Sequence, residues 1–348
     1  MIVLACIGGG AAYLQYLGPP PVAAVAGVGA PVAEAVAAKP VETKSAAEPQ
    51  KIGQLTVEGS LGAGSKLAGG AAIPMPEPAL LAPSNNNPKW LVPQISPDGV
   101  TPMQAYAASD RLPANAPAAD TPEVAIMVAG LGDDISQSLA ATSILPPAVS
   151  LALTPYGHQL PATQAAARAT GHEMILILPM PALLASLPLS DNQGTLDWAM
   201  AQIQGYAGVT DAFGPDMSGG FMDDQFSKSW LLTNIATRGL FFVEGNTDAA
   251  TNPLVWGRTA DEVIDPANGP AEESAELDAL AAAAQSQHTA LGIMLNPTPN
   301  AVQALAAWCA TLAPQGIRLV PVSALVVPPV TAQATTQATQ ATTASAKQ

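Results

Sequence analysis

Positive charge is scarce in this sequence. The 348 residues include 12 Lys and Arg against 27 Asp and Glu, which gives a formal net charge of -15 at pH 7. Proteins that bind nucleic acid need clustered Lys and Arg to neutralise phosphates. Between Val124 and Val327 the cationic residues are only Arg168, Lys228, Arg238, Arg258 and Arg318. The composition therefore excludes a nucleic-acid-binding protein.

Cysteine and histidine are also rare. The two cysteines, Cys6 and Cys309, are too few for a disulfide framework and exclude a zinc site built on Cys. A catalytic zinc ion needs about three protein ligands, usually including His. Of the three histidines, His158 alone follows a predicted strand, whereas His172 precedes one and His288 ends a predicted helix. The residues thus predict no metal site.

The first 17 residues are apolar except for Gln15, and they stop at a Gly-Pro-Pro-Pro turn. A helix of this length is slightly short for a membrane span, and no Lys or Arg precedes Lys39. We nevertheless interpret residues 1–17 as a membrane anchor or signal segment. This predicts a periplasmic or exported protein, attached to the inner membrane by its N-terminus if the segment is uncleaved.

Two further regions lack the periodicity of a folded domain. Residues 18–120 are dominated by Ala, Pro and Gly and predict a disordered linker, in which 90–92 and 103–106 are exceptions that can dock on the folded part. Residues 328–348 predict a low-complexity, disordered tail. The folded domain is therefore expected at 121–327.

Short apolar runs alternate with helical stretches within that domain. Uninterrupted apolar runs are typical of strands buried on both faces of a parallel sheet. The predicted strands are 124–128, 149–153, 174–178, 240–243, 291–295 and 317–320, with weaker candidates at 212–213 and 262–264. The predicted helices are 160–169, 196–206, 226–237, 271–287 and 300–312. This is an α/β pattern, and seven or eight repeats favour a βα barrel over an open sheet.

Functional residues of a βα barrel follow the carboxyl ends of its strands. The candidate catalytic carboxylates at such positions are Asp133, Asp216 and Glu244, although Asp133 also suits the N-terminus of a helix. His158 is also a candidate base, but the sequence shows no partner that would position it. The candidate substrate-binding residues are Tyr156, His158, Asp265 and Asn296.

A series of short motifs occurs in a recognisable order between Val124 and Val327. They are Gly130-Leu131-Gly132 after a strand, Leu145-Pro146, Val149 to Tyr156, Gly171-His172-Glu173 running into Leu178-Pro179-Met180-Pro181, Met217, Gly239 to Phe242, Asp261 to Asp265, Asn296-Pro297 and Gly316 to Ser323. In this order the motifs resemble the divergent polysaccharide deacetylase family, YibQ-like proteins distantly akin to the NodB carbohydrate esterases. The resemblance implies a deformed seven-stranded βα barrel, TIM-like and of the glycoside hydrolase/deacetylase type.

The same resemblance implies a chemistry whose residues are replaced here. In deacetylases of this class an Asp and two His hold a divalent metal such as zinc, and another Asp acts as base. This chain has Ala129-Gly130 where the family carries Asp-Asp, and Ile177 where it carries His. Three other blocks also differ and read Pro215-Asp216, Glu244 to Thr247, and Leu295-Asn296-Pro297. We therefore expect a degenerate site that has not retained its metal ligands.

These observations lead to one function and two alternatives. The first is a cell-envelope protein of carbohydrate metabolism that binds a polysaccharide or peptidoglycan on a deacetylase scaffold without metal-dependent turnover. The alternative is an active carbohydrate deacetylase, an amide or ester hydrolase with a relocated carboxylate site. A purely structural barrel would show neither binding nor turnover.

Overall fold

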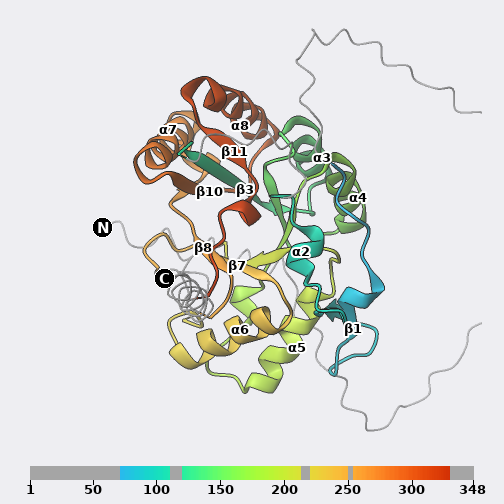
Figure 1. The fold of residues 1–348 in the computed structure, drawn as a ribbon. Helices are drawn as coiled ribbons and strands as arrows, with labels where there is room; N and C mark the ends of the chain where they lie inside the picture. The colour runs from blue at the N-terminus through green and yellow to red at the C-terminus, as the bar shows by residue number, and fades with distance from the viewer. Residues whose placement is uncertain (1–70, 110–119, 213–219, 250–253, 330–348) are drawn as a thin grey trace, which may run out of the picture. The chain divides into compact units, whose positions relative to one another are not determined.

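Strands and helices alternate along the computed structural model from residue 123 to residue 320 (Figure 1). The structure describes residues 71–109, 120–212, 220–249 and 254–329. The predicted anchor at 1–17, the first part of the predicted linker, Asp216 and most of the predicted tail lie outside the described residues. Within the described ranges, no helix is both long and apolar enough to cross a membrane.

Nine strands form one sheet, and every hydrogen-bonded pair of strands in it is parallel. The strands are β3 (Glu123–Leu131), β4 (Ser150–Leu153), β5 (Met174–Ile177), β6 (Gly208–Thr210), β7 (Phe241–Glu244), β8 (Gly257–Thr259), β9 (Glu262–Ile264), β10 (Thr289–Leu295) and β11 (Arg318–Val320). Their order is β8-β7-β6-β5-β4-β3-β10-β9, and β11 pairs with the first three residues of β3.

All six strands predicted from uninterrupted apolar runs are confirmed. The two differences concern strands that have only a weak apolar signal in the sequence. The strand predicted at 212–213 lies slightly earlier, as β6, and β8 was not predicted. Both strands are short and carry Gly or polar residues, so neither produces an apolar run in the sequence.

In the described residues, six α-helices follow strands of this sheet and cover its outer side (Figure 1). They are α3 (Ile135–Ile144), α4 (Leu160–Thr170), α5 (Leu189–Met200), α6 (Gln225–Thr237), α7 (Pro270–Gln287) and α8 (Pro299–Leu312). Short 3-10 turns occur in the connections, at Met180–Ala182, Pro266–Asn268 and Ala313–Gln315, and after β11, at Val322–Ala324. Asp134, Asp224 and Thr298 begin three of the helices by accepting hydrogen bonds from backbone N–H groups in the first turn. The helix expected at 196–206 begins earlier, at Leu189, and ends at Met200.

The two end strands of the sheet order, β8 and β9, are separated in the chain only by Ala260 and Asp261. Ala260 N donates to Glu244 O at 3.0 Å, which continues the ladder with β7. Asp261 N donates to Leu291 O at 2.8 Å, which begins the ladder with β10. One extended segment thus joins both ends of the sheet. Counted as one strand, it brings the main path of this curled sheet to seven strands, which is consistent with the predicted deformed seven-stranded barrel.

Alternate residues of the strands enter two different cores. In β3, Ala125, Met127 and Ala129 face the interior of the barrel, together with Ile175, Ile177, Phe241, Val243, Leu291 and Ile293 from other strands. The neighbouring residues Val124, Ile126 and Val128 pack in the core beneath the helices. Because both faces of each strand are buried, the strands read as continuous apolar runs.

Residues 71–109, here called the strap, fall within the stretch whose composition predicts a linker. They form a 3-10 turn (Pro78–Leu80), an antiparallel pair of strands, β1 (Leu81–Pro83) and β2 (Leu91–Pro93), and a short helix, α2 (Pro102–Tyr106). Ile73, Leu80, Tyr106 and Ala108 are buried in the interior core of the barrel. The docked part of this region is therefore larger than the two short exceptions expected from the sequence.

Three buried charged side chains hold the strap in place. Arg168 donates to the carbonyl of Pro74 at 2.9 Å. Asp197 of α5 accepts from Ser84 Oγ at 2.6 Å, and Glu173 accepts from Ala108 N at 3.0 Å. Glu173 directly precedes β5, so this last contact places the end of the strap at the amino ends of the barrel strands. The opposite, carboxyl-end face remains available for function.

Candidate functional site

The carboxyl ends of the strands are apolar on the inside of the barrel. Ala129 of β3, Ile177 of β5 and Ala212, just after β6, all belong to the interior core and are buried. Leu295, at the end of β10, packs against the same core. None of these side chains can bind a metal ion or transfer a proton. The zinc ion implied by the resemblance therefore finds no ligand among these four residues.

The loop after β10 crosses directly over the end of β3. Asn296 N donates to Ala129 O at 2.9 Å, and a Cβ atom placed on Gly130 would overlap the Asn296 Oδ1 atom. Gly130 also has a φ of +93°, which side-chain-bearing residues rarely adopt. The Asn296 side chain thus occupies the space into which an acidic side chain at position 130 would extend.

Gly130→Ala is expected to lower the free energy of unfolding by about 2 kcal/mol, because it combines a positive φ with overlap on Asn296. Chemical denaturation of Gly130→Ala and of the double variant Gly130→Ala/Asn296→Ala separates the cost of the backbone strain from the cost of the overlap. The double variant should recover the part due to overlap and retain the backbone strain. Equal stability of Gly130→Ala and the unchanged protein would contradict the close approach.

The structure gives His158 the partner that the sequence did not show. Asp133 Oδ1 lies 2.6 Å from His158 Nδ1, and both side chains are solvent-accessible, with exposed fractions of 44% and 78% respectively. Gln159 N donates to Gly132 O at 2.8 Å, which links the loops that carry the pair. Asp133 therefore acts on His158, while its neighbour Asp134 caps α3, and the hydrogen bonds from that turn lower the pKa of Asp134.

Tyr156, two residues before His158 in the sequence, forms an aromatic pair with Trp198 of α5. The rings of Tyr156 and Trp198 have centroids 5.1 Å apart and are tilted by 44°. Both side chains are half-buried, so each keeps part of its surface exposed. Tyr156, a predicted substrate-binding residue, thus belongs to a partly exposed apolar platform on the rim of the carboxyl-end face.

Glu244 is not a free carboxylate at the mouth of the barrel. It alternates with the interior residue Val243 along β7, and its Oε2 atom lies 2.9 Å from Lys228 Nζ of α6. Asp211, which follows β6, is hydrogen-bonded to Glu244 and accepts from Gly245 N at 2.5 Å. Burial, the charge of Glu244 and their hydrogen bond raise the pKa of Asp211 well above its usual value.

Asp211 was not a candidate in the sequence analysis. The weak strand signal at 212–213 placed this residue just before a strand, whereas β6 ends at Thr210 and leaves Asp211 at its carboxyl end. An acidic residue after the pattern Gly208-Val209-Thr210 was the signal that could have identified it.

The other predicted residues that the structure describes, Asp265 and Asn296, make local contacts of their own. Asp265 accepts from Ala267 N at 3.0 Å and so begins a 3-10 turn, and Asn296 lies over Gly130. Asp216 is outside the described residues. Among the residues that the structure describes, no group of three or more His, Cys, Asp or Glu side chains is arranged to hold a metal ion.

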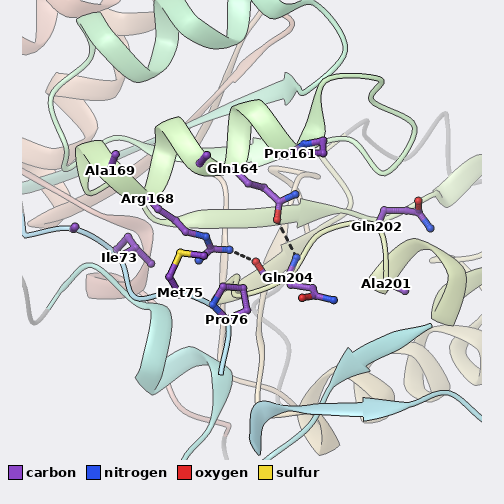
Figure 2. Close-up of a pocket in the computed structure, with 12 residues that line it drawn as sticks. Ile73, Met75, Pro76, Pro161, Gln164, Arg168, Ala169, Ala201, Gln202 and Gln204 are labelled. Atoms are coloured by element: carbon purple, nitrogen blue, oxygen red, sulfur yellow. Dashed lines mark hydrogen bonds between the residues drawn. The ribbon is translucent and has the colours of Figure 1, made fainter. Parts of the chain in front are cut away.

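A groove of about 550 Å³ lies elsewhere, between α4, the start of the strap and the connection from α5 to β6 (Figure 2). Its walls are mostly apolar, and Arg168 is its charged residue. The Arg168 guanidinium donates to the carbonyls of Pro74, Gln204 and Gly205. These bonds explain the buried charge as an attachment of the strap, not as a ligand site.

Comparisons with known proteins agree with the motif order. The model of the family described as divergent polysaccharide deacetylase matches residues 126–326. The uncharacterized protein ATU2773 from Agrobacterium tumefaciens C58, known from a crystal structure, is similar with a TM-score of 0.59 and 29% sequence identity. That similarity covers 68% of this chain and 99% of the other. No curated protein matches this chain.

Proposed function

The chain belongs to the divergent polysaccharide deacetylase family, and we propose that it binds a polysaccharide or peptidoglycan of the cell envelope without metal-dependent deacetylation. The proposal includes export, with residues 1–17 serving as the signal segment or as an inner-membrane anchor.

The observation that carries this proposal is the apolar end of the barrel interior. Metal-dependent deacetylation needs ligands and a base at the carboxyl ends of the strands. The side chains that face the barrel interior there include Ala129, Ile177 and Ala212, and Asn296 lies over Gly130. The scaffold of the family is retained, while these interior positions supply neither metal ligands nor a base, which supports binding without metal-dependent chemistry.

The rim of the same face supports binding of a sugar. Aromatic side chains offer large, rigid apolar surfaces with a polar edge, which suits the mixed faces of a pyranose ring. Tyr156 and Trp198 provide such a surface. His158 and Asp133, in the adjacent loops, offer hydrogen-bonding groups for sugar hydroxyls.

Tyr156→Ala is expected to weaken binding of a chitooligosaccharide or a soluble peptidoglycan fragment about tenfold, because it removes about 1.4 kcal/mol of ring contact. Calorimetry on the full chain measures this change. Trp256→Ala is a matched control, since Trp256 is also partly exposed but immediately precedes β8, at the amino end of that strand. Equal affinity of Tyr156→Ala and the unchanged protein would place the glycan elsewhere.

A second assay separates binding from turnover. The proposal expects no acetate release from an N-acetylated glycan, with or without added Zn²⁺. The alternative, a hydrolase with a relocated carboxylate site, is favoured by one observation, the 2.6 Å contact between Asp133 and His158. Acetate release that persists with a chelator and is lost in Asp133→Asn would replace the binding proposal with this alternative.

A further inference from the structure

Three ionisable side chains from three elements meet beneath the carboxyl-end face. Asp211 follows β6, Glu244 ends β7 and Lys228 lies in the first half of α6. Both acidic residues are 4% exposed, and the Lys228 side chain is 20% exposed. The cluster is therefore largely removed from water, where unpaired charge is costly.

The contacts of the cluster leave one donor to be supplied. Lys228 Nζ donates to Glu244 Oε2 at 2.9 Å and Gly245 N donates to Asp211 Oδ1 at 2.5 Å. A hydrogen bond between the two carboxyl groups needs a proton, because a carboxylate has no hydrogen to donate. Burial and the charge of Glu244 raise the pKa of Asp211, so Asp211 is the group that binds this proton.

Charge balance leads to the same state. Two carboxylates and one ammonium group carry a net charge of −1, whereas the same set with one shared proton is neutral. The charged groups that act on Asp211 are Glu244 from β7 and Lys228 from α6. Lys228 is paired with Glu244, so an ionised Asp211 would have no cation of its own in this arrangement.

The backbone leaves little space for the two acids to separate. A Cβ atom on Gly245 would lie 3.1 Å from both Asp211 Oδ1 and the Ala212 Cα atom, so the ends of β6 and β7 approach closely at this point. Thr210 Oγ1 donates to Val243 O at 3.0 Å and adds a second bridge between the same strands. Repulsion between two ionised carboxylates would therefore act directly on the strand ends.

We propose that Asp211 and Glu244 form a pH-sensitive latch, in which one shared proton holds the carboxyl ends of β6 and β7 together and its loss loosens them. The inference goes beyond glycan binding and does not depend on it. It assigns a conformational role to two buried acids that the proposed function does not use.

The direction of the pH effect follows from the raised pKa of Asp211. The folded protein keeps this proton to a higher pH than the unfolded chain, whose Asp has the ordinary value of 3.8. Stability is therefore lost as the pH rises from that value to the folded pKa. A one-proton difference changes the ratio of closed to open forms by up to about tenfold per pH unit.

Hydrogen exchange on the full chain tests the latch. Protection of the amides at 208–212 and 241–246, corrected for the intrinsic dependence of exchange on pH, is expected to fall as the pH rises. In Asp211→Asn, the side-chain amide supplies a permanent donor to Glu244 and still accepts from Gly245, so protection should no longer depend on pH. Asp278→Asn, at an exposed carboxylate on α7, is the matched control and should behave like the unchanged protein.

A second measurement covers the case in which Asp211→Asn fails to fold. Infrared spectroscopy of the unchanged protein should show the carbonyl band of a protonated buried carboxyl group, and this band should disappear as protection falls. In Lys228→Gln the carbonyl band should disappear at a higher pH, because removing the cation makes ionisation of the pair of acids less favourable. Absence of the band at all pH values, or pH-independent protection in the unchanged protein, would overturn the latch.

Discussion

A chain that begins at residue 120 is expected to be less stable than one that begins at residue 71 by about 5 kcal/mol or more. The strap buries Ile73, Leu80 and Tyr106 in the interior core of the barrel. Burial of each such side chain contributes roughly 1.5–3 kcal/mol, part of which is offset by the cost of ordering the strap. Because small domains are stable by about 5–15 kcal/mol, this loss is comparable to the whole stability.

Removal of the strap also takes hydrogen-bond donors away from two buried acidic groups. Glu173 loses the donor Ala108 N, and Asp197 loses the donors Ser84 Oγ and Asn86 Nδ2. These losses add to the exposure of the barrel interior at its amino end. The chain beginning at residue 120 is therefore expected to show exposed apolar surface and a weak or non-cooperative unfolding transition.

Denaturant unfolding followed by circular dichroism compares chains 71–329 and 120–329 with the full protein. The first should unfold at the same denaturant concentration as the full protein, because it keeps every contact described for the strap. Binding of a hydrophobic dye reports exposure of the interior core in the second. Equal unfolding midpoints of the two shortened chains would show that the strap is peripheral to the fold.

Glu173→Ala is expected to lower the free energy of unfolding by about 4 kcal/mol. The carboxylate is fully buried and accepts from Ala108 N, Ser323 N and Ser150 Oγ at 3.0–3.1 Å. These donors come from the strap, the C-terminal segment and β4, so the variant leaves three regions with unsatisfied buried groups. Each such group costs about 1–3 kcal/mol, before any entry of water.

Thermal and denaturant unfolding of Glu173→Ala, Glu173→Gln and Asp278→Ala measure this effect. Asp278 is an exposed acid on α7, so its replacement controls for the loss of a negative charge and should change stability by less than about 0.5 kcal/mol. Glu173→Gln keeps an acceptor and should lie between the other two. A loss below about 1 kcal/mol in Glu173→Ala would show that Glu173 does not join these segments.

Burial also raises the pKa of Glu173 despite the donors around it. The unchanged protein should therefore lose stability as the pH rises from the ordinary Glu range to the higher folded pKa, and Glu173→Gln should lack this contribution. The same unfolding curves, recorded across that pH range, measure the difference.

The predicted parts of the fold are those encoded by local patterns. Val124 to Val128 reads as a strand because both faces of β3 are buried, and Thr298-Pro299 reads as a helix start because the side-chain cap and the fixed φ act within one turn. The strap was less predictable, because its burial depends on separate residues such as Leu80 and Tyr106, which have no common period.

The candidate site divides in the same way. The order of the motifs predicts that the apolar residues Ala129 and Ile177 replace an Asp and a His of the family. The structure places both residues in the interior core. The partners of the ionisable residues could not be predicted from the sequence. Glu244 was a candidate catalytic residue in the sequence, yet the contact with Lys228 of α6 makes it part of a buried cluster.

The α/β class, the succession of strands and helices and the family resemblance can all be predicted from the sequence, because each depends on short-range patterns and on their order. The contacts of Asp133 with His158 and of Asp211 with Glu244, and the docking of the strap on the barrel, form only when the chain is folded. Asp133 and His158 lie 25 residues apart. Such contacts depend on strand pairing and on where each strand ends, and a shift of one residue would turn the side chain to the opposite face.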